Sequence, residues 1–331
     1  MKKDERLRCA LIYGGRGHES EVSLRGKEHI LPLVDNTKYN VIPIFIDKSG
    51  VWYTDGEPCV AYRGGFFCPD SGRFSAVDCA FPLLHGDYGE DGCVQGALEC
   101  ASIPYVGCDV RSAAVCRDKA LVKMVATGIG IPTLPYITLL RREGVDYATR
   151  LCEASLSYPV FIKPTCLGSS VGVARADNTT MLRLGIERAF ALSDRIIVEP
   201  YLSDKRELEC GYFSTKSKEI FTNPGEILSN GIYGYEEKYL TGDVEVVVRA
   251  EICEDTCGLI REYARRLCRA LGVRDLSRVD FFLSGTEIYF NEINTMPGFT
   301  ESSLYAKMLS AYGYGEGALI ESLIDSATAR G

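Results

Sequence analysis

The sequence predicts an α/β protein of two or three domains, with a largely parallel sheet in its N-terminal part. Three apolar runs rich in β-branched and aromatic residues occupy positions 7–13, 41–46 and 76–84, and each is followed by glycine or charge. Helix-like stretches alternate with these runs, which is the order of βαβ units. A chain of 331 residues also exceeds the usual size of one compact domain, so clefts between domains are expected.

The elements of the first two domains follow in order along the chain. A helix with an imperfect apolar period is predicted over 21–34, and the first sheet is expected to end near Tyr105. The second domain begins near a helix at 118–128, which glycines and a proline then break. It contains predicted strands at 158–163 and 195–199, and between them lie a glycine-rich segment at 166–172 and a helix at 180–192.

The third domain is predicted to contain a long helix and a hairpin. The apolar stripe of the helix is formed by Leu259, Ile260, Tyr263, Leu267 and Leu271. Two strands follow at 278–283 and 287–294, and the Ser-Gly-Thr sequence between them is typical of a hairpin turn.

Composition excludes several classes of protein. The formal net charge of −8 and the lack of a block of Lys and Arg argue against a nucleic-acid partner. The charged start of the chain is neither a signal peptide nor a membrane span, so no membrane partner is expected. Fourteen cysteines are spread evenly with no C-x-x-C pair, which favours reduced, buried thiols in a cytoplasmic protein over a disulfide framework.

Oxygen-bearing side chains in the hairpin predict a magnesium site. Asp280, Glu292 and Asn294 interrupt otherwise apolar strands, and strand residues two apart share a face. A three-residue turn would pair Arg278 with Glu292 and Asp280 with Phe290, which places the charged residues and Asn294 on one side. Hard oxygen ligands without His or Cys suit Mg²⁺ that is also bound by substrate phosphates. The alternative is a solvated face of an edge hairpin.

The glycine-rich segment is a candidate phosphate site. Its glycines would let backbone N–H groups approach phosphate oxygens, Ser169 and Ser170 add hydroxyl donors, and Lys163 at the end of the preceding strand can reach the same oxygens. The standard G-x-x-x-x-G-K-[ST] and G-x-G-x-x-G loops do not occur. A plain flexible loop is the alternative interpretation.

Five motifs, in order, make the chain resemble the D-alanine–D-alanine ligases over nearly its whole length. They are Gly14-Gly15 leading to Glu19-Ser20-Glu21-Val22-Ser23, His85-Gly86-Asp87-Tyr88-Gly89-Glu90-Asp91-Gly92, Lys163-Pro164 leading to Gly168-Ser169-Ser170-Val171-Gly172, Tyr235-Glu236-Glu237-Lys238-Tyr239, and Asn291-Glu292-Ile293-Asn294-Thr295-Met296-Pro297-Gly298-Phe299-Thr300.

The resemblance implies an ATP-grasp fold with an N-terminal parallel-sheet domain. That substrate-binding domain would span 1–110, a central subdomain with the glycine-rich loop 111–208, and a C-terminal subdomain with a lid loop and the magnesium site 209–331. ATP would lie between the last two, with two Mg²⁺ ions that Mn²⁺ could replace. The family further implies a cytoplasmic homodimer that serves peptidoglycan precursor synthesis.

The implied reaction is ATP-dependent ligation of two D-alanines through an acyl phosphate. By position in the motifs, Glu19 would bind the first ammonium group, while Ser169 and Tyr239 would link to it and fix the loop over the site. Other roles also follow from position alone: the oxyanion hole from Arg278 and the N–H of Gly298, amino-acid contacts from His85, Ser303 and Leu304, phosphate contacts from Lys119, Lys163 and Lys238, adenine and ribose contacts from Glu199 and Glu207, and metal ligands from Asp280, Glu292 and Asn294.

Two departures from the family pattern concern the lid and its surroundings. Ile232-Tyr233-Gly234-Tyr235 stands where Phe-Tyr-Asp-Tyr is common, and Ala306 replaces a frequent proline. The Glu-Lys-Tyr pattern at 237–239 argues against D-lactate as the second substrate, and apolar Leu304 favours D-alanine over D-serine. A D-alanine–D-serine ligase and a non-catalytic ATP-binding regulator are the alternatives.

Overall fold

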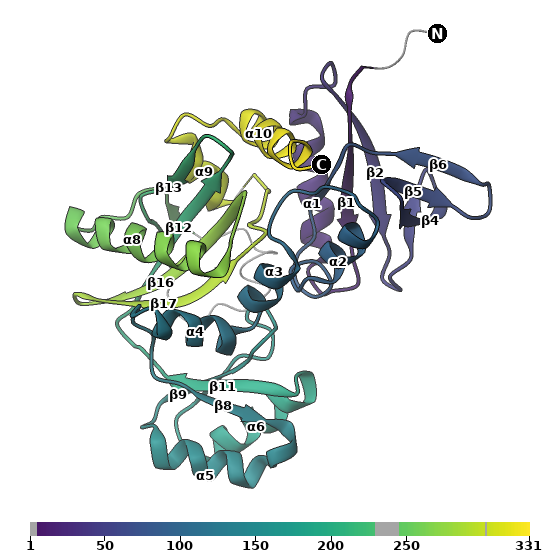
Figure 1. Ribbon diagram of the computed structural model, residues 1–331. Coiled ribbons are helices and arrows are strands. Elements are labelled where there is room, and N and C mark those ends of the chain that lie inside the picture. Colours follow the sequence, from purple (N-terminus) through teal and green to yellow (C-terminus); the bar gives the residue numbers. More distant parts are fainter. Residues whose placement is uncertain (1–4, 229–244, 302) are drawn as a thin grey trace.

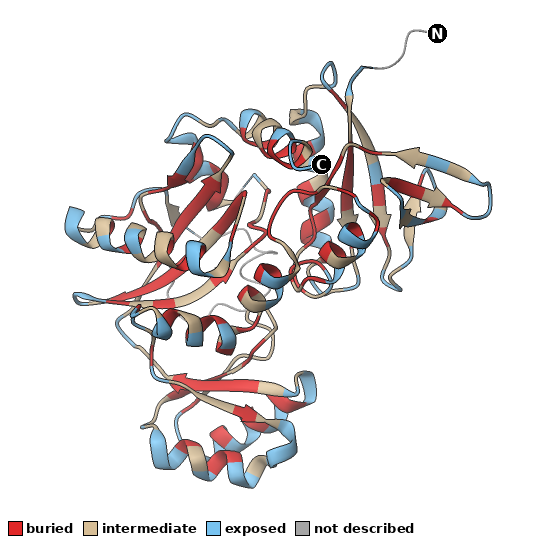
Figure 2. Cartoon of the chain, in the orientation of Figure 1, coloured by how far each residue is buried: buried red, intermediate tan, exposed pale blue. Residues whose placement is uncertain are grey.

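The computed structural model describes residues 5–228, 245–301 and 303–331, which form three lobes around three sheets (Figure 1). The central strands of each lobe are mainly buried, whereas the outer faces of the covering helices are exposed (Figure 2). No helix in these ranges is long and apolar enough to cross a membrane. All fourteen cysteines are free thiols, and ten of them are buried, as predicted.

The first lobe contains the predicted parallel strands. β1 (Leu7–Gly14) pairs in parallel with β2 (Tyr39–Ile46) on one side and with β7 (Cys79–Pro82) on the other. α1 (Ser20–Ile30) connects β1 towards β2 and ends in the short 3-10 helix Leu31–Leu33, because Pro32 cannot extend the α-helix. α2 (Cys93–Cys100) follows β7 and packs beside the same sheet.

Four short strands of this sheet are absent from the sequence prediction. They form an antiparallel extension beyond β2, made of β3 (Trp52–Thr54), β4 (Glu57–Tyr62), β5 (Gly65–Cys68) and β6 (Arg73–Ala76). The predicted run 76–84 is therefore too long, since Ala76 ends β6 and the buried strand β7 begins at Cys79.

The second lobe is a four-stranded sheet in the order β10-β9-β11-β8. Its strands are β8 (Ile137–Leu140), β9 (Val160–Pro164), β10 (Ala174–Ala176) and β11 (Arg195–Pro200). α5 (Val145–Ser155) and α6 (Thr179–Leu192) cover one face, and the apolar core lies between them and the sheet. The glycine-rich segment connects β9 to β10 at the end of the lobe that meets the third sheet.

The third lobe combines a second large sheet with three helices. Its strands are β12 (Arg206–Ser214), β13 (Glu219–Phe221), β14 (Gly225–Leu228), β15 (Glu245–Val247), β16 (Leu276–Ser284) and β17 (Glu287–Asn294). α3 (Val110–Arg117), α4 (Lys119–Gly128) and α8 (Glu254–Leu271) share one apolar core with this sheet. Leu259 is 42% exposed, so the buried stripe of α8 excludes it and is centred on Ile260, Ala264 and Leu267. The domain boundaries given by the resemblance stay a prediction.

The register of the β16–β17 hairpin differs from the predicted one. Ser284 pairs with Glu287, so the turn has two residues, and a β-bulge follows between Asp280 and Phe281. Asp280 therefore pairs with Glu292, whereas the three-residue turn would have paired it with Phe290. The turn and the bulge each shift the register by one residue. Because a shift of two residues leaves every side chain on its original face, the polar residues still share a face.

The C-terminal helices return the chain to the first lobe. α9 (Leu304–Ser310) packs on β12, and α10 (Glu316–Thr328) shares a core with β1 and β7. Three polar contacts join α10 to this lobe: His29 to Glu316 at 2.6 Å, Lys38 to Glu321 at 2.8 Å, and Tyr39 to Asp325 at 2.8 Å. The first and third lobes are thus fixed to each other by the end of the chain.

Candidate active site

Two adjacent cavities lie where the three lobes meet. The first, of about 220 Å³, is lined by residues of the first and third lobes and by the glycine-rich segment. The second, of about 160 Å³, is lined mainly by the second and third lobes. The residues common to both are Lys119, Gly168, Ser169, Glu209, Ile227, Arg278 and Glu292.

The predicted polar face of the hairpin lies at this junction. Arg278 donates to both carboxylate oxygens of Asp280, at 2.8 Å and 2.7 Å, and Asn294 Nδ2 donates to the same carboxylate at 3.1 Å. Glu292 forms an ion pair with Lys119 at 3.1 Å. Burial opposes the charge on Arg278, but the carboxylates of Asp280 and Glu209 outweigh it and raise the pKa of the guanidinium.

Glu209 was missed by the sequence analysis. It lies on β12 directly opposite Asp280 and pairs with Arg278 at 3.2 Å, with only 4% of its surface exposed. The sequence does contain a signal, because Glu207 and Glu209 alternate with apolar residues on one strand. Glu207 was singled out and Glu209 was not, although both line the second cavity.

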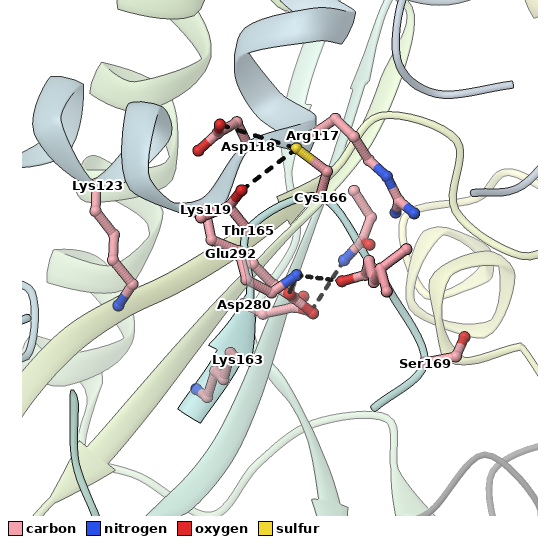
Figure 3. A network of polar contacts seen from close by, with 12 residues as sticks. Arg117, Asp118, Lys119, Lys123, Lys163, Thr165, Cys166, Ser169, Asp280 and Glu292 are labelled. Carbon is pink, nitrogen blue, oxygen red and sulfur yellow. Dashed lines mark hydrogen bonds and ion pairs between the residues drawn. The ribbon is translucent and has the colours of Figure 1, made fainter. Parts of the chain in front are cut away.

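Lys119 and Lys163 line the second cavity, and a third lysine, Lys123, contacts Glu199 of its wall. Lys119 donates to the carbonyl of Leu167 at 2.8 Å, in the glycine-rich segment, as well as pairing with Glu292. Lys163 pairs with Glu199, as its place at the end of β9 allows. Lys123, missed by the sequence analysis, lies 3.1 Å from the other oxygen of Glu199. Figure 3 shows Lys123 and Lys163 on one side of the hairpin carboxylates.

Glu199 is a buried anion between two cations. Both Glu199 and Lys123 are 1% exposed. Burial disfavours the charge of Glu199, but Lys123 and Lys163 outweigh burial and lower the pKa of its carboxyl to about 2. Burial also lowers the pKa of Lys123, which Glu199 partly offsets. Glu207 lies nearer to solvent and pairs with Lys205.

The glycine-rich segment connects the two cavities. Ser169 donates from Oγ to the carboxylate of Glu19, which joins the second lobe to the first. Ser169 and Ser170 both have positive φ, 51° and 61°, a conformation that side-chain-bearing residues seldom adopt. Such backbone strain is typical of ligand-binding loops.

The first cavity contains the remaining predicted residues that the structure describes. Ser303 Oγ accepts a hydrogen bond from the backbone N–H of Thr300 at 2.9 Å, and a Cβ on Gly298 would lie 2.9 Å from the same oxygen, so a larger residue at 298 would displace the Ser303 hydroxyl. His85 Nδ1 lies 3.1 Å from the carbonyl of Met296, whereas its buried Nε2 has no hydrogen-bond partner within the described ranges.

Leu304 begins α9, is buried, and faces the same cavity. Lys238 and Tyr239 fall in 229–244, outside the described residues, as does the unusual sequence at 232–235. Their predicted roles stay predictions. Arg117 and Glu90 also line the first cavity and were not singled out as site residues.

The oxygen ligands fit a magnesium ion that substrate phosphates complete. Within the described ranges, no group of three or more His, Cys, Asp and Glu residues could hold a metal. Asp280 and Glu292 supply two carboxylates, and Asn294 adds an amide oxygen on the same face. A site with so few protein ligands suits Mg²⁺, which usually keeps waters and phosphate oxygens in its shell.

A third cavity, of about 250 Å³, lies behind the first. It lies at the carboxyl ends of β1 and β2, where Gly14 and Ile46 line it, and its wall includes Trp52, the single tryptophan of the chain. Arg16 lies over the ring of Tyr88 at its rim, 4.4 Å from the ring centre. His85 lines both the first and the third cavity.

Comparison with known proteins gives one family. A family model for the N-terminus of D-ala D-ala ligase matches residues 8–63 and 68–108, and one for the C-terminus matches residues 125–325. A D-alanine–D-alanine ligase of Caldicellulosiruptor bescii is 37% identical, over 97% of this chain and 95% of that protein. The corresponding protein of Solibacter usitatus is 39% identical, over 98% and 96%.

The fold agrees with solved structures of the same class. The VanG D-Ala:D-Ser ligase of Enterococcus faecalis superposes with a TM-score of 0.88 at 34% identity, covering 97% of this chain and 99% of that one.

Proposed function

Because the chain belongs to the D-alanine–D-alanine ligase family, we propose that it uses ATP to join two molecules of D-alanine into D-alanyl-D-alanine. The observation that carries this proposal is the shared wall of the two cavities. A phosphoryl group held between Lys119 and Arg278 is within reach of a nucleotide on one side and of an amino acid on the other. The ATP-grasp fold supplies this arrangement.

The first step is transfer of the γ-phosphoryl group to the carboxylate of the first D-alanine, which gives ADP and an acyl phosphate. A free carboxylate is a poor electrophile, and phosphorylation supplies a leaving group. We assign Glu19 to the ammonium group of this substrate, because its carboxylate faces the first cavity beside Ser169. We assign His85 to the same substrate, because it belongs to the same lobe and lines the same cavity.

The second step is attack by the amine of the second D-alanine on the acyl carbon. The new C–N bond forms, phosphate leaves, and the amine loses a proton. We assign the tetrahedral oxyanion to Arg278 and to the N–H of Gly298, because donors that are already fixed in place stabilise developing charge most effectively. Ser303 and Leu304 contact the second substrate, and an apolar Leu304 favours D-alanine over D-serine.

Phosphates and nucleotide have separate partners. Lys119 and Lys163 contact the phosphates, Lys238 joins them from the lid, and Glu199 and Glu207 contact adenine and ribose. Asp280, Glu292 and Asn294 would hold Mg²⁺, with two ions expected and Mn²⁺ as a substitute. The metal would neutralise the phosphate charge that builds up during transfer.

Tyr239 is assigned to the loop that covers the site. A homodimer, a cytoplasmic location and a role in peptidoglycan precursor synthesis remain predictions.

The test is an assay of purified protein with ATP and Mg²⁺. D-Alanine should release phosphate and yield one dipeptide per phosphate, with dipeptide measured by chromatography and L-alanine as the matched control. ATP binding without release of phosphate in the presence of D-alanine, D-serine or both would instead identify a non-catalytic regulator. A mixed dipeptide formed in preference to D-alanyl-D-alanine would identify a D-serine ligase.

A further inference from the structure

Arg117 is a buried cation in the wall of the amino-acid cavity. It ends α3, immediately before Asp118, the residue that caps α4. Its side chain is 10% exposed and lines the first cavity. Its Nε has no hydrogen-bond partner within the described part of the chain. A buried guanidinium with an unused donor is costly, so its place in the cavity wall calls for a functional reason.

Two carboxylates of the segment after β7 hold this guanidinium. Asp87 lies 3.2 Å from one terminal nitrogen, and Glu90 lies 3.4 Å from the other. Glu90 is almost fully buried and also accepts the N–H of Gly86 at 2.9 Å. Burial opposes the charge of Arg117, but Glu90, Glu19 and Asp87 outweigh it and raise the pKa of the guanidinium.

Arg117 and Glu19 lie side by side between two glycine backbones. A Cβ added to Gly168 would lie 3.1 Å from Arg117 Nη1 and 3.4 Å from Glu19 Oε2. A Cβ added to Gly86 would contact Glu19 Oε2 and lie 3.6 Å from Arg117 Nη2. Despite this proximity, no ion pair within 4 Å joins Arg117 to Glu19 among the described residues. The guanidinium is occupied by the other two acids.

The charges in this corner leave a negative excess. Three carboxylates, Glu19, Asp87 and Glu90, lie around one guanidinium, which pairs with the last two. A group carrying positive charge is therefore favoured beside Glu19, and a neutral hydroxyl in the same place would leave the excess uncompensated.

We propose that Arg117 is a positioning residue for the first amino acid. Together with Asp87 and Glu90 it fixes the segment after β7 and the glycine-rich loop around Glu19. The Glu19 carboxylate thereby stays available for the substrate ammonium group. The inference rests on the proposed function. The negative charge of this corner selects a substrate with an α-ammonium group over one with a hydroxyl at the first position.

A purely structural role makes a different prediction. If Arg117 only neutralises the buried Glu90, then removing both charges together should restore the enzyme. If Arg117 positions the site, removing both should restore stability and leave amino-acid binding weak. The variants Arg117→Met, Glu90→Gln and the double variant separate the two, and Arg111→Met on the exposed side of the same helix is the matched control.

Glu90 provides a second readout that depends on pH. Its pKa is raised by burial, which Arg117 partly offsets, and Glu19 and His85 also face it. Arg117→Met should raise that pKa further. A carboxyl whose pKa is raised by folding makes the protein less stable as pH rises from the unfolded pKa through the folded one, so the melting temperature of this variant should fall over that interval. The double variant should lack that fall.

Binding of D-alanine is measured by titration calorimetry with ADP and Mg²⁺ present, and turnover is measured in parallel. Arg117→Met and the double variant should bind D-alanine about 10- to 100-fold more weakly, as misplacement of binding groups typically does, with ATP affinity within about twofold of wild type. Arg117→Lys should recover part of the loss.

The proposal would be overturned if the double variant bound D-alanine with wild-type affinity. It would also be overturned if the variants lost affinity for D-alanine and for ATP to the same extent. Calorimetry keeps the test separate from the proposed function, because a chain that bound D-alanine without ligating it would refute the ligase assignment and still report on Arg117.

Discussion

Glu292 belongs to the hairpin, lines both cavities and pairs with Lys119, so a change there affects the junction itself. We expect Glu292→Gln to abolish ligation and leave the fold intact, since the amide keeps the shape and removes charge needed to neutralise the transferring phosphoryl group. Dipeptide formation at saturating Mg²⁺ checks this, with Glu287→Gln at the exposed start of the same strand as control. Wild-type turnover of Glu292→Gln would refute the metal assignment.

We predict that Leu304, which lines the first cavity, decides the second substrate. The methyl side chain of D-alanine would meet only the apolar leucine there, while the hydroxyl of D-serine would need a new partner. An apolar pocket rejects an added hydroxyl only modestly, on the order of 10²-fold. We expect D-alanine to be preferred over D-serine in competition. Leu304→Arg should reduce this preference, because the guanidinium adds a hydrogen-bond donor for the hydroxyl of D-serine. Chromatographic separation of the two dipeptides decides it, and a native preference for D-serine would contradict the assignment.

At the scale of elements, the buried Lys123–Glu199 pair ties α4 to β11. We expect Lys123→Met to destabilise the protein by about 3 kcal/mol, because it leaves Glu199 with one cation. The pKa of Glu199 is about 2 in the folded protein, below the ordinary 4.5, so its ionisation stabilises the fold above pH 4.5 and loses this effect as pH falls towards 2. The variant should raise that pKa and show less loss of stability over that interval.

Melting temperatures from pH 7 to pH 3 test this expectation. As a control, Arg141→Met removes an exposed ion pair with Asp194 and should change the melting temperature little. If Lys123→Met had the same melting temperature as the wild type at pH 7, Lys163 alone would be enough to compensate the charge of Glu199.

The same elements show how far sequence can predict this molecule. Long apolar runs identified β1, β9 and β11, because burial of whole strands leaves a clear pattern. The strands β3 to β6 have three to six residues each and are interrupted by glycine and charge, so periodicity cannot find them. Lys123 was missed for a related reason, since a lysine on an amphipathic helix is usually solvated and only tertiary packing buries it.

The polar face of the hairpin was predicted correctly from a wrong register. The alternation of Arg278, Asp280, Glu292 and Asn294 fixes which residues share a face, while the turn length and the bulge at Asn291 fix which residues are opposite. Side-chain alternation is visible in a sequence. A bulge depends on the local fit of two strands, so the pairing could only come from the structure.

At the scale of the whole molecule, the chain end fixes the lobes to each other. Arg330 pairs with buried Asp275 of the third lobe at 2.6 Å and donates to the carbonyl of Tyr105 in the first lobe at 2.6 Å. We expect Arg330→Met to cost about 3 kcal/mol, because it leaves a buried carboxylate with fewer partners. Thermal unfolding measures this, and Lys216→Met, which removes an exposed contact to Ala329, is the control. Equal melting temperatures of Arg330→Met and the wild type would show that the hydrogen bonds from Gly107 and Ser326 are enough to stabilise the buried Asp275 carboxylate.

The single tryptophan makes the enzyme its own optical reporter. Trp52 is the only indole in the chain, and its cavity is separated from the amino-acid cavity by His85, which lines both. Emission excited at wavelengths that indole absorbs and the phenol of tyrosine does not therefore comes from one known place, without labelling. Any substrate that shifts His85 changes the surroundings of that indole. A stopped-flow trace of emission after mixing with D-alanine would time the arrival of the first substrate, separately from the release of phosphate.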